Sequence, residues 1–298
     1  MGHTVEGSLG GRSASARLWG SVLVVVGQRA FYAFIYGLLV LLAVAMILPY
    51  VWMISNSLKY VPDFFQHPYD LIPKPPTLVT YYNAFTYGRI SLYIQNSLLY
   101  TVAVLGARLL LESLAAYAFA RVPFPGRDQL FLALLATLML PGTVTLIPRF
   151  LMVHYFGLAN TYPGVVLPSF AGAFGIFLLR QFFLNIPSEL EDAALIDGAN
   201  RLTIWWRVIL PLAQPALVAL AVFTFLDEWN SFLWPLIVLS DWKKYPITVG
   251  ITLFRDMYST DWPMVFAGST LVSFPVIIMF FFAQRHVVGG ISLSGLKA

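Results

Sequence analysis

The chain has 298 residues, of which 59% are hydrophobic and only 11% are charged, and its formal net charge is +4. A soluble domain carries about 25% charged residues, so part of this protein's surface must lie in the hydrocarbon of a bilayer. The sequence has no cysteine, which excludes disulfides, thiolate metal sites and iron–sulfur clusters. Its histidines are widely separated and form no metal-binding pattern: His3, His67, His154 and His286.

The first segment, residues 1–29, is predicted to be a cytoplasmic tail followed by an interfacial stretch. It is rich in Gly and Ser, and its apolar run at 18–26 is too short to span a bilayer. Gln28 and Arg29 are poor cleavage-site residues and a second apolar run follows at once. We therefore expect an interfacial or helix-extending segment without cleavage.

Residues 30–286 are predicted to form an all-α polytopic transmembrane domain, followed by a cytoplasmic tail at 287–298. A proline-rich connection at 55–90 is expected to be an ordered loop with short helices. Apolar runs long enough to cross a membrane give six expected spans, at about 30–54, 92–120, 129–148, 161–183, 211–239 and 262–284.

The distribution of basic residues sets the expected topology, because Lys and Arg concentrate in cytoplasmic loops. Arg121 and Arg127 flank the turn after the second span, and Arg180, Arg201 and Arg207 flank the polar segment after the fourth. We therefore expect both termini and the segment 185–213 in the cytoplasm.

The segment 185–215 is the most polar long stretch between two apolar runs, and it holds Glu189, Glu191, Asp192 and Asp197. Ser188 with Glu191 three positions later predicts a capping box at a helix start. Gly198 is expected just beyond the helix end, where left-handed geometry costs glycine nothing. A second short helix is predicted at 203–210, ended by Pro211 and Pro215.

A helix of about ten residues is too short to be stable alone, so it must pack on something. Leu190, Ala193 and Ala194 give it a small apolar face. The alternative is an ordinary loop helix lying on the bilayer. Interfacial helices, however, are usually basic and carry large apolar residues, so a docking element is favoured.

The pattern Asp192-Ala193-Ala194-Leu195-Ile196-Asp197-Gly198, followed by Ile209-Leu210-Pro211, resembles the EAA loop of binding-protein-dependent ABC importer permeases. One position departs from the family pattern, since Asp192 stands for the usual Glu and reaches one methylene less far. The stretches 124–128, 177–183, 228–236 and 289–298 are similar to the carbohydrate-type branch, in particular the smaller, maltose-type second permease subunit.

This resemblance implies a type I ABC importer permease fold in a prokaryotic plasma (inner) membrane. It implies a homologous second permease subunit, two copies of a cytoplasmic ABC ATPase, and a periplasmic or lipid-anchored solute-binding protein. The substrate would be a sugar or a sugar derivative. The ATPase-coupling residues would be Glu191, Asp192, Ala193, Ala194, Asp197, Gly198 and Pro211.

No catalytic, cofactor-binding or metal-binding residues are expected in this chain. The phosphate-binding pattern GxxxxGK[ST] is absent from the sequence. The chain is therefore expected not to be an enzyme, with ATP bound by its partner subunits.

Charged residues inside the predicted spans are costly and usually face a cavity or a partner. Asp227, Glu228, Trp229 and Asn230 are candidates for the substrate path, with Trp229 stacking on a sugar ring and Asn230 bonding hydroxyls. At most two of the four would line the path, because helical neighbours point in different directions. A break in the helix, or proximity to the outer interface, explains these residues equally well.

Arg108 and Glu112 lie four positions apart and are expected to form an intramembrane ion pair. An alternative function uses these two residues with Asp227 and Glu228 as the proton relay of a self-sufficient secondary transporter. Inverted repeats would support that alternative, and no convincing repeat relates the two halves of the sequence.

Overall fold

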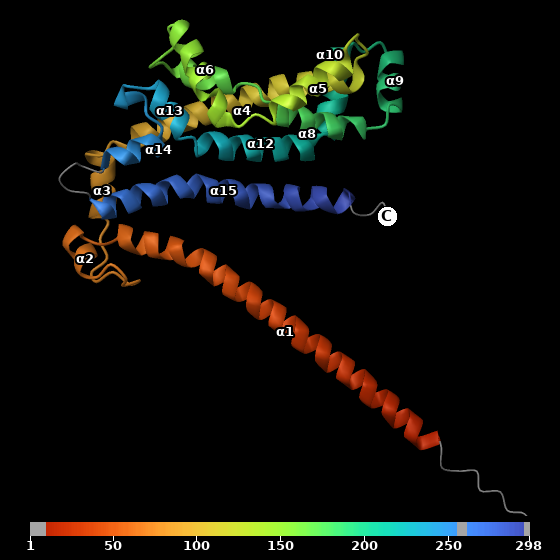
Figure 1. Cartoon of the computed structure of the whole chain (residues 1–298), viewed down its shortest axis with the longest axis vertical. Coiled ribbons are helices and arrows are strands. Elements are labelled where there is room, and N and C mark those ends of the chain that lie inside the picture. Colours follow the sequence, from red (N-terminus) through yellow and green to blue (C-terminus); the bar gives the residue numbers. More distant parts are fainter. Residues whose placement is uncertain (1–9, 255–260, 295–298) are drawn as a thin grey trace, which may run out of the picture.

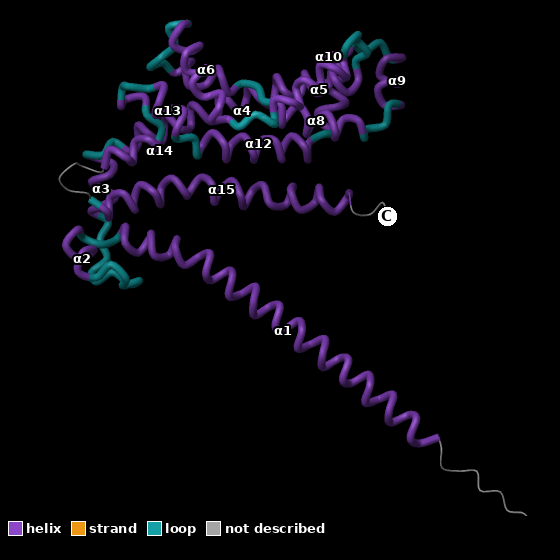
Figure 2. The backbone as a smooth tube through the Cα atoms, viewed as in Figure 1, coloured by secondary structure: helices purple, strands orange, loops and turns teal. Residues whose placement is uncertain are grey.

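The computed structural model describes residues 10–254 and 261–294, and within them every regular element is helical (Figures 1 and 2). Three helices are long and apolar enough to cross a membrane: α1 (Gly10–Ser57), α4 (Ile90–Arg121) and α15 (Trp262–Ser294). They confirm the first, second and sixth predicted spans. Because α1 begins at Gly10, the short apolar run at 18–26 extends this helix.

The other three predicted spans are each a bent pair of helical segments. α5 (Arg127–Thr137) and α6 (Gly142–Tyr155) meet at 100°. α7 (Tyr162–Val166) with η1 (Leu167–Ser169) meets α8 (Ala173–Leu184) at 40°, and the segment Arg201–Leu212 meets α12 (Gln214–Trp229) at 82°. Counting each bent pair as one span gives up to six spans.

Proline marks the bend between α5 and α6. Pro141 has extended backbone (ψ 132°) at the start of α6, and proline cannot continue a preceding helix without loss of a backbone hydrogen bond. The fifth predicted span is also shorter than expected, because α12 ends at Trp229 and α13 (Leu233–Val238) is a separate helix.

The connection at 55–90 is ordered, as predicted, and contains α2 (Val61–Gln66) and α3 (Val79–Thr86). Lys59 is buried there, and its Nζ donates to Asn56 Oδ1 (2.9 Å) and to the His67 carbonyl (2.7 Å). Burial lowers the pKa of Lys59.

A second group of short helices comprises η3 (Trp242–Lys244), α14 (Ile247–Gly250) and η4 (Ile251–Phe254).

α4 lies at the centre of the helical body and packs on α8 and α12 (Figure 1). Its approach to α8 depends on small residues, because a methyl group at Gly175 would overlap Glu112 Oε2. α1 contacts the body only towards its C-terminal end and then diverges from it (Figure 1). α9 (Glu189–Ile196) lies at the other end of the body from α2 and α3 (Figure 1).

Candidate functional site

The short helix α9 is closed at its C-terminal end by a glycine turn, as the sequence predicts. Gly198 has a φ of 81°. Its N–H donates to the Leu195 carbonyl (3.0 Å), and the N–H of Ala199 donates to the Ala194 carbonyl (2.9 Å). This pair of bonds is a Schellman motif, and it turns the chain sharply into the next helical segment.

The predicted capping box at the start of α9 is wrong. The Ser188 side chain makes no capping hydrogen bond, and Glu191 points into the protein. The carboxylate of Glu191 lies 2.9 Å from Arg121 Nε as an ion pair, without hydrogen-bond alignment, and 3.8 Å from Arg201 Nη1. The Tyr117 hydroxyl lies 3.2 Å from Glu191 Oε2 and donates to it. We call Glu191, Arg121, Arg201 and Tyr117 the α9 cluster.

The Glu191 carboxylate joins α9 to α4, through Arg121 and Tyr117, and to Arg201 in the segment that follows α9. Arg121, at the end of α4, also donates Nη2 to the carbonyls of Phe183 (2.6 Å) and Ile186 just after α8. It thus adds hydrogen bonds to carbonyls at and just beyond the end of α8. Since Glu191 is only 4% exposed, the expectation that its side chain meets an ATPase is corrected: Glu191 holds α9 against its own chain.

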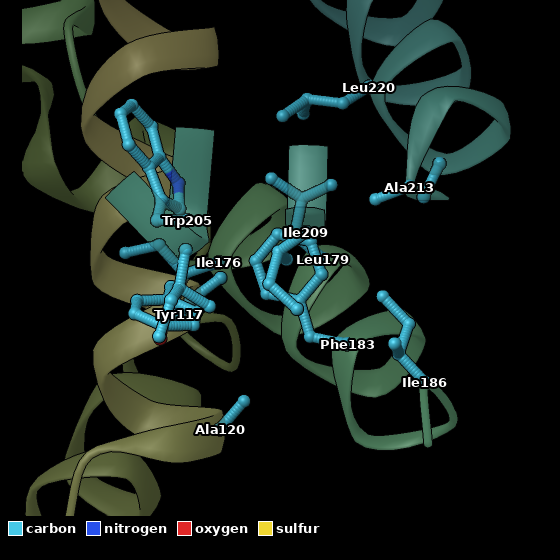
Figure 3. Packing of buried hydrophobic residues seen from close by; sticks show 13 residues of the cluster. Tyr117, Ala120, Ile176, Leu179, Phe183, Ile186, Trp205, Ile209, Ala213 and Leu220 are labelled. Atoms are coloured by element: carbon cyan, nitrogen blue, oxygen red, sulfur yellow. The ribbon is translucent and has the colours of Figure 1, made fainter. Parts of the chain in front are cut away.

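A buried apolar cluster lies behind α9 and fixes the segment that follows it. This segment comprises α10 (Arg201–Ile204), the π-helical turn η2 (Trp205–Ile209) and α11 (Leu210–Leu212). Figure 3 shows Leu179, Phe183 and Ile209 converging beside α8. The second helix, predicted at 203–210, begins earlier, at Arg201, and the helical segment continues through Pro211 to Leu212. The chain then bends before α12.

The outer surface of the loop carries most of the other residues expected to couple to a partner. Asp192, Ala193, Asp197, Gly198 and Pro211 are exposed, and Ala194 is half-buried. Sequence reasoning missed a set of large apolar side chains on the same loop, which are Ile196 (87% exposed), Leu202 (65%) and Trp206 (62%). Their signal was the presence of large apolar residues in an otherwise polar segment.

A second charged group lies within the membrane-spanning helices around Arg108. Its Nη1 is 3.4 Å from Asp227 Oδ2 and its Nη2 is 3.3 Å from Glu228 Oε1. Glu112 Oε1 lies 3.9 Å from Arg108 Nε. These four residues therefore form one connected group, which we call the Arg108 cluster.

The Arg108 cluster holds the break between η1 and α8. Arg108 Nε donates to the Ser169 carbonyl (2.7 Å), and the N–H of Gly172 donates to Glu112 Oε1 (2.7 Å). Arg149 of α6 donates to Ser169 Oγ (2.8 Å). A cation thus meets the carbonyl end of η1 and an anion meets the amino end of α8, which is the favourable arrangement for helix termini.

The four candidates for the substrate path divide by exposure. Asp227 is open, with 67% of its side chain exposed, and Asn230 is exposed. Glu228 is held by Arg108, with 9% of its side chain exposed. Trp229 is 1% exposed, stacks on Phe225 and donates its indole N–H to the Val272 carbonyl (2.9 Å). The expectation that Trp229 stacks on a sugar is corrected, since both its face and its donor are occupied.

No group of three or more His, Asp or Glu side chains in residues 10–254 and 261–294 has the arrangement of a metal site.

Comparison with known proteins identifies the family. Residues 112–292, more than half of the chain, match the family described as binding-protein-dependent transport system inner membrane component. The diacetylchitobiose uptake system permease protein NgcG of Streptomyces coelicolor is 35% identical over 269 residues, covering 89% of each chain. The arabinooligosaccharides transport system permease protein AraQ of Halalkalibacterium halodurans is 32% identical and covers 84% of this chain and 91% of the relative.

A solved structure has the same architecture. It is described as a bacterial ABC transporter involved in the import of the acidic polysaccharide alginate. One of its chains aligns with a TM-score of 0.77 and 25% identity, covering 91% of this protein and 97% of that chain. The protein therefore belongs to the family of binding-protein-dependent transport system inner membrane components, as a multi-pass permease subunit of the bacterial inner membrane.

Proposed function

We propose that this chain is the permease subunit of an ATP-driven importer that translocates a sugar or sugar derivative. The observation that carries the proposal is the design of α9: its inner side is fixed to α4 and α8 by Glu191 and Arg121, while its outer side is left open. A push on α9 would therefore move two membrane helices. In a binding-protein-dependent system the ATPase is a separate subunit, and it is the proposed source of that push.

The surface proposed to meet the ATPase combines acidic and apolar side chains. Asp192 and Asp197 call for Arg or Lys on the ATPase. Ile196, Leu202 and Trp206 supply exposed apolar surface, of the kind that marks an interaction site when it is contiguous. The shorter reach of Asp192 requires its basic partner to approach closely.

The second proposed partner, a homologous permease subunit, would cover α1. Between Phe31 and Ile54 no residue is buried within this chain, and large apolar residues run along this whole stretch. The helix is therefore unpaired over most of its membrane length, and a second permease can pack on it by van der Waals contact.

The proposed substrate class follows from the relatives. The similar proteins are described as permeases for diacetylchitobiose, arabinooligosaccharides and sn-glycerol-3-phosphate. A periplasmic or lipid-anchored binding protein would deliver the solute at the α2 and α3 end. In this proposal α9 and both termini face the cytoplasm, in line with the basic residues that flank the α9 loop.

A second candidate function is proton-coupled transport without an ATPase. It is favoured by one observation, the direct connection of Arg108 with Glu112, Asp227 and Glu228. The two candidates differ in their energy source, so proteoliposomes that contain this chain and its partners separate them. Uptake with a proton gradient and no ATP would overturn the first proposal.

The main test uses the complete complex in proteoliposomes with ATP inside. Asp192→Lys or Gly198→Asp is expected to abolish ATP-driven uptake and solute-stimulated ATP hydrolysis, while the chain still reaches the membrane. Asp128→Lys makes the same charge change on a residue with 71% of its side chain exposed, outside the α9 loop, and is expected to retain ATP-driven uptake. Normal uptake by the Asp192 and Gly198 variants would contradict the proposed coupling surface.

A further inference from the structure

A pocket of about 280 Å³ lies against the Arg108 cluster, between α4, α8 and α12. Arg108, Glu112 and Asp227 supply its charged wall. Phe174 of α8 and Phe223 of α12 line it as well, and their rings meet edge to face with centroids 5.5 Å apart. Both phenylalanines are about half exposed. The pocket thus combines a polar wall with an apolar wall inside the membrane-spanning region.

The polar wall has hydrogen-bonding capacity that the described chain does not use. Glu112 and Thr224 are each 1% exposed, and Glu112 Oε2 and Thr224 Oγ1 have no hydrogen-bond partner among the described residues. Leaving a buried polar atom unpaired is costly. Glu112 Oε2 and Thr224 Oγ1 can both accept hydrogen bonds, so a ligand with hydroxyl or N–H donors would complete this wall.

The charges of the wall favour an uncharged ligand. Arg108 already faces the Ser169 carbonyl, Asp227 and Glu228, and Glu112 adds a third carboxylate near the same cation. An anion would meet the carboxylates of Glu112 and Asp227 and an Arg whose donors are engaged. A neutral donor avoids this repulsion and still supplies the hydrogen bonds that carboxylate oxygens accept.

The apolar wall further restricts the class of ligand that fits this pocket. A sugar ring has apolar C–H faces and hydroxyls along its edge, so it can lie on Phe223 while its hydroxyls reach Asp227. Small-molecule sites in general are mostly apolar with a few placed polar groups. We propose that this pocket is a binding station for a neutral sugar unit, with Asp227 and Glu112 as hydrogen-bond acceptors and Phe174 and Phe223 as the stacking wall. This inference rests on the proposed function.

Thiol labelling tests the occupancy of the pocket directly, because the chain has no native cysteine. In the complete complex, Phe223→Cys is treated with a small methanethiosulfonate reagent during ATP-driven turnover. The neutral probes are N,N′-diacetylchitobiose and an arabino-oligosaccharide, and sn-glycerol 3-phosphate is the anionic probe. The neutral probes are expected to slow labelling several-fold and the anionic probe to have no effect.

The matched control is Phe280→Cys, on the exposed side of α15 (62% exposed, against 53% for Phe223) and outside the pocket. Its labelling rate is expected to be the same with every probe. Equal labelling of Phe223→Cys under all conditions overturns the inference. Protection of Phe223→Cys by glycerol 3-phosphate but not by the neutral sugars also overturns it.

Uptake kinetics give a second readout. Asp227→Ala removes a charged hydrogen-bond acceptor, and such a bond contributes about 1.5 kcal/mol or more. It is expected to raise the KM for the neutral probe about tenfold or more. Phe280→Ala is expected to leave the KM within about twofold. If wild-type uptake is ATP-driven and Asp227→Ala leaves KM unchanged, only this inference fails. If wild-type uptake needs no ATP, the proposed function itself fails.

Discussion

The two charged clusters of this protein are built in opposite ways. In the α9 cluster one carboxylate, Glu191, is shared by Arg121, Arg201 and the Tyr117 hydroxyl. In the Arg108 cluster one guanidinium is shared by Glu112, Asp227 and Glu228. α4 contributes to both, with Arg108 and Glu112 near its middle and Tyr117 and Arg121 near its end.

The difference teaches how one helix can serve two purposes. The α9 cluster is closed, because Glu191 has only 6% of its side chain exposed and meets two bases and a hydroxyl donor, so it suits a fixed joint. The Arg108 cluster is open on one side, because 67% of the Asp227 side chain is exposed, so it suits a site that receives donors from a ligand. Since α4 runs unbroken from Ile90 to Arg121, a movement of α4 would displace both the α9 cluster and the Arg108 cluster.

The largest predicted effect is at the fixed joint. Glu191→Ala removes the carboxylate that pairs with Arg121, whose side chain is mostly buried. Breaking a buried ion pair in this way costs about 3–5 kcal/mol. We expect a large drop in thermal stability in detergent and loss of ATP-driven uptake. Glu189→Ala, an exposed acid on the same helix, is the control and should behave as wild type. Equal stability of the two variants would show that Glu191 is not a structural joint.

The next effect tests the close contact at the Arg108 cluster. A methyl group at Gly175 would overlap the Glu112 carboxylate, whereas one at Gly172 would lie 3.4 Å from Glu112 Oε1. Overpacking of this kind costs about 1–3 kcal/mol. Gly175→Ala should therefore lower the melting temperature clearly more than Gly172→Ala, measured in the same detergent. A reversed order would mean that Glu112 can move freely, against its role in fixing the break before α8.

A smaller effect is predicted at the turn after α9. Gly198 has a positive φ of 81° and open space around it, so Gly198→Ala adds only backbone strain, of about 1–2 kcal/mol. Gly142→Ala is the matched control, because a methyl group there also meets nothing within 4 Å but Gly142 has no positive φ. We expect a modest loss of stability and slower uptake for Gly198→Ala alone, measured by thermal unfolding and by transport rate.

The smallest effect is expected at charges outside both clusters. Asp128 lies 3.1 Å from Arg127 and 3.9 Å from Arg180, and 71% of its side chain is exposed. Exposed pairs contribute about 0–1 kcal/mol, so Asp128→Ala should leave the melting temperature nearly unchanged. A drop comparable to that of Glu191→Ala would contradict the distinction drawn between buried clusters and surface pairs.

Hydropathy located the spans well where the apolar run is continuous. α1, α4 and α15 were predictable because length and composition alone decide whether a helix can cross a bilayer. The breaks were not, since proline and glycine are tolerated in membrane helices when other groups satisfy the freed backbone. Before α8 those groups are Arg108 and Glu112, which lie on another helix, and no local pattern contains them.

The α9 loop shows the same limit. The glycine turn at Gly198 was predictable because it depends on local backbone geometry. The capping box was not realised, because Arg121 and Tyr117 compete for Glu191 from about seventy residues away in the sequence. The burial of Trp229 likewise depends on Phe225 and on the Val272 carbonyl of α15, a contact that only the packed bundle creates.

The shape of α1 has a consequence for its rotation about its own axis. Apolar side chains are exposed along it from Phe31 to Ile54, so a lipid bilayer fixes its depth but gives little preference for which side faces which way. Its azimuth is set near one end, where Trp52 donates to the Pro68 carbonyl (2.9 Å) and packs edge to face on Phe266. The side of α1 that a neighbouring subunit meets is therefore decided by the contacts of Trp52 and not by the bilayer.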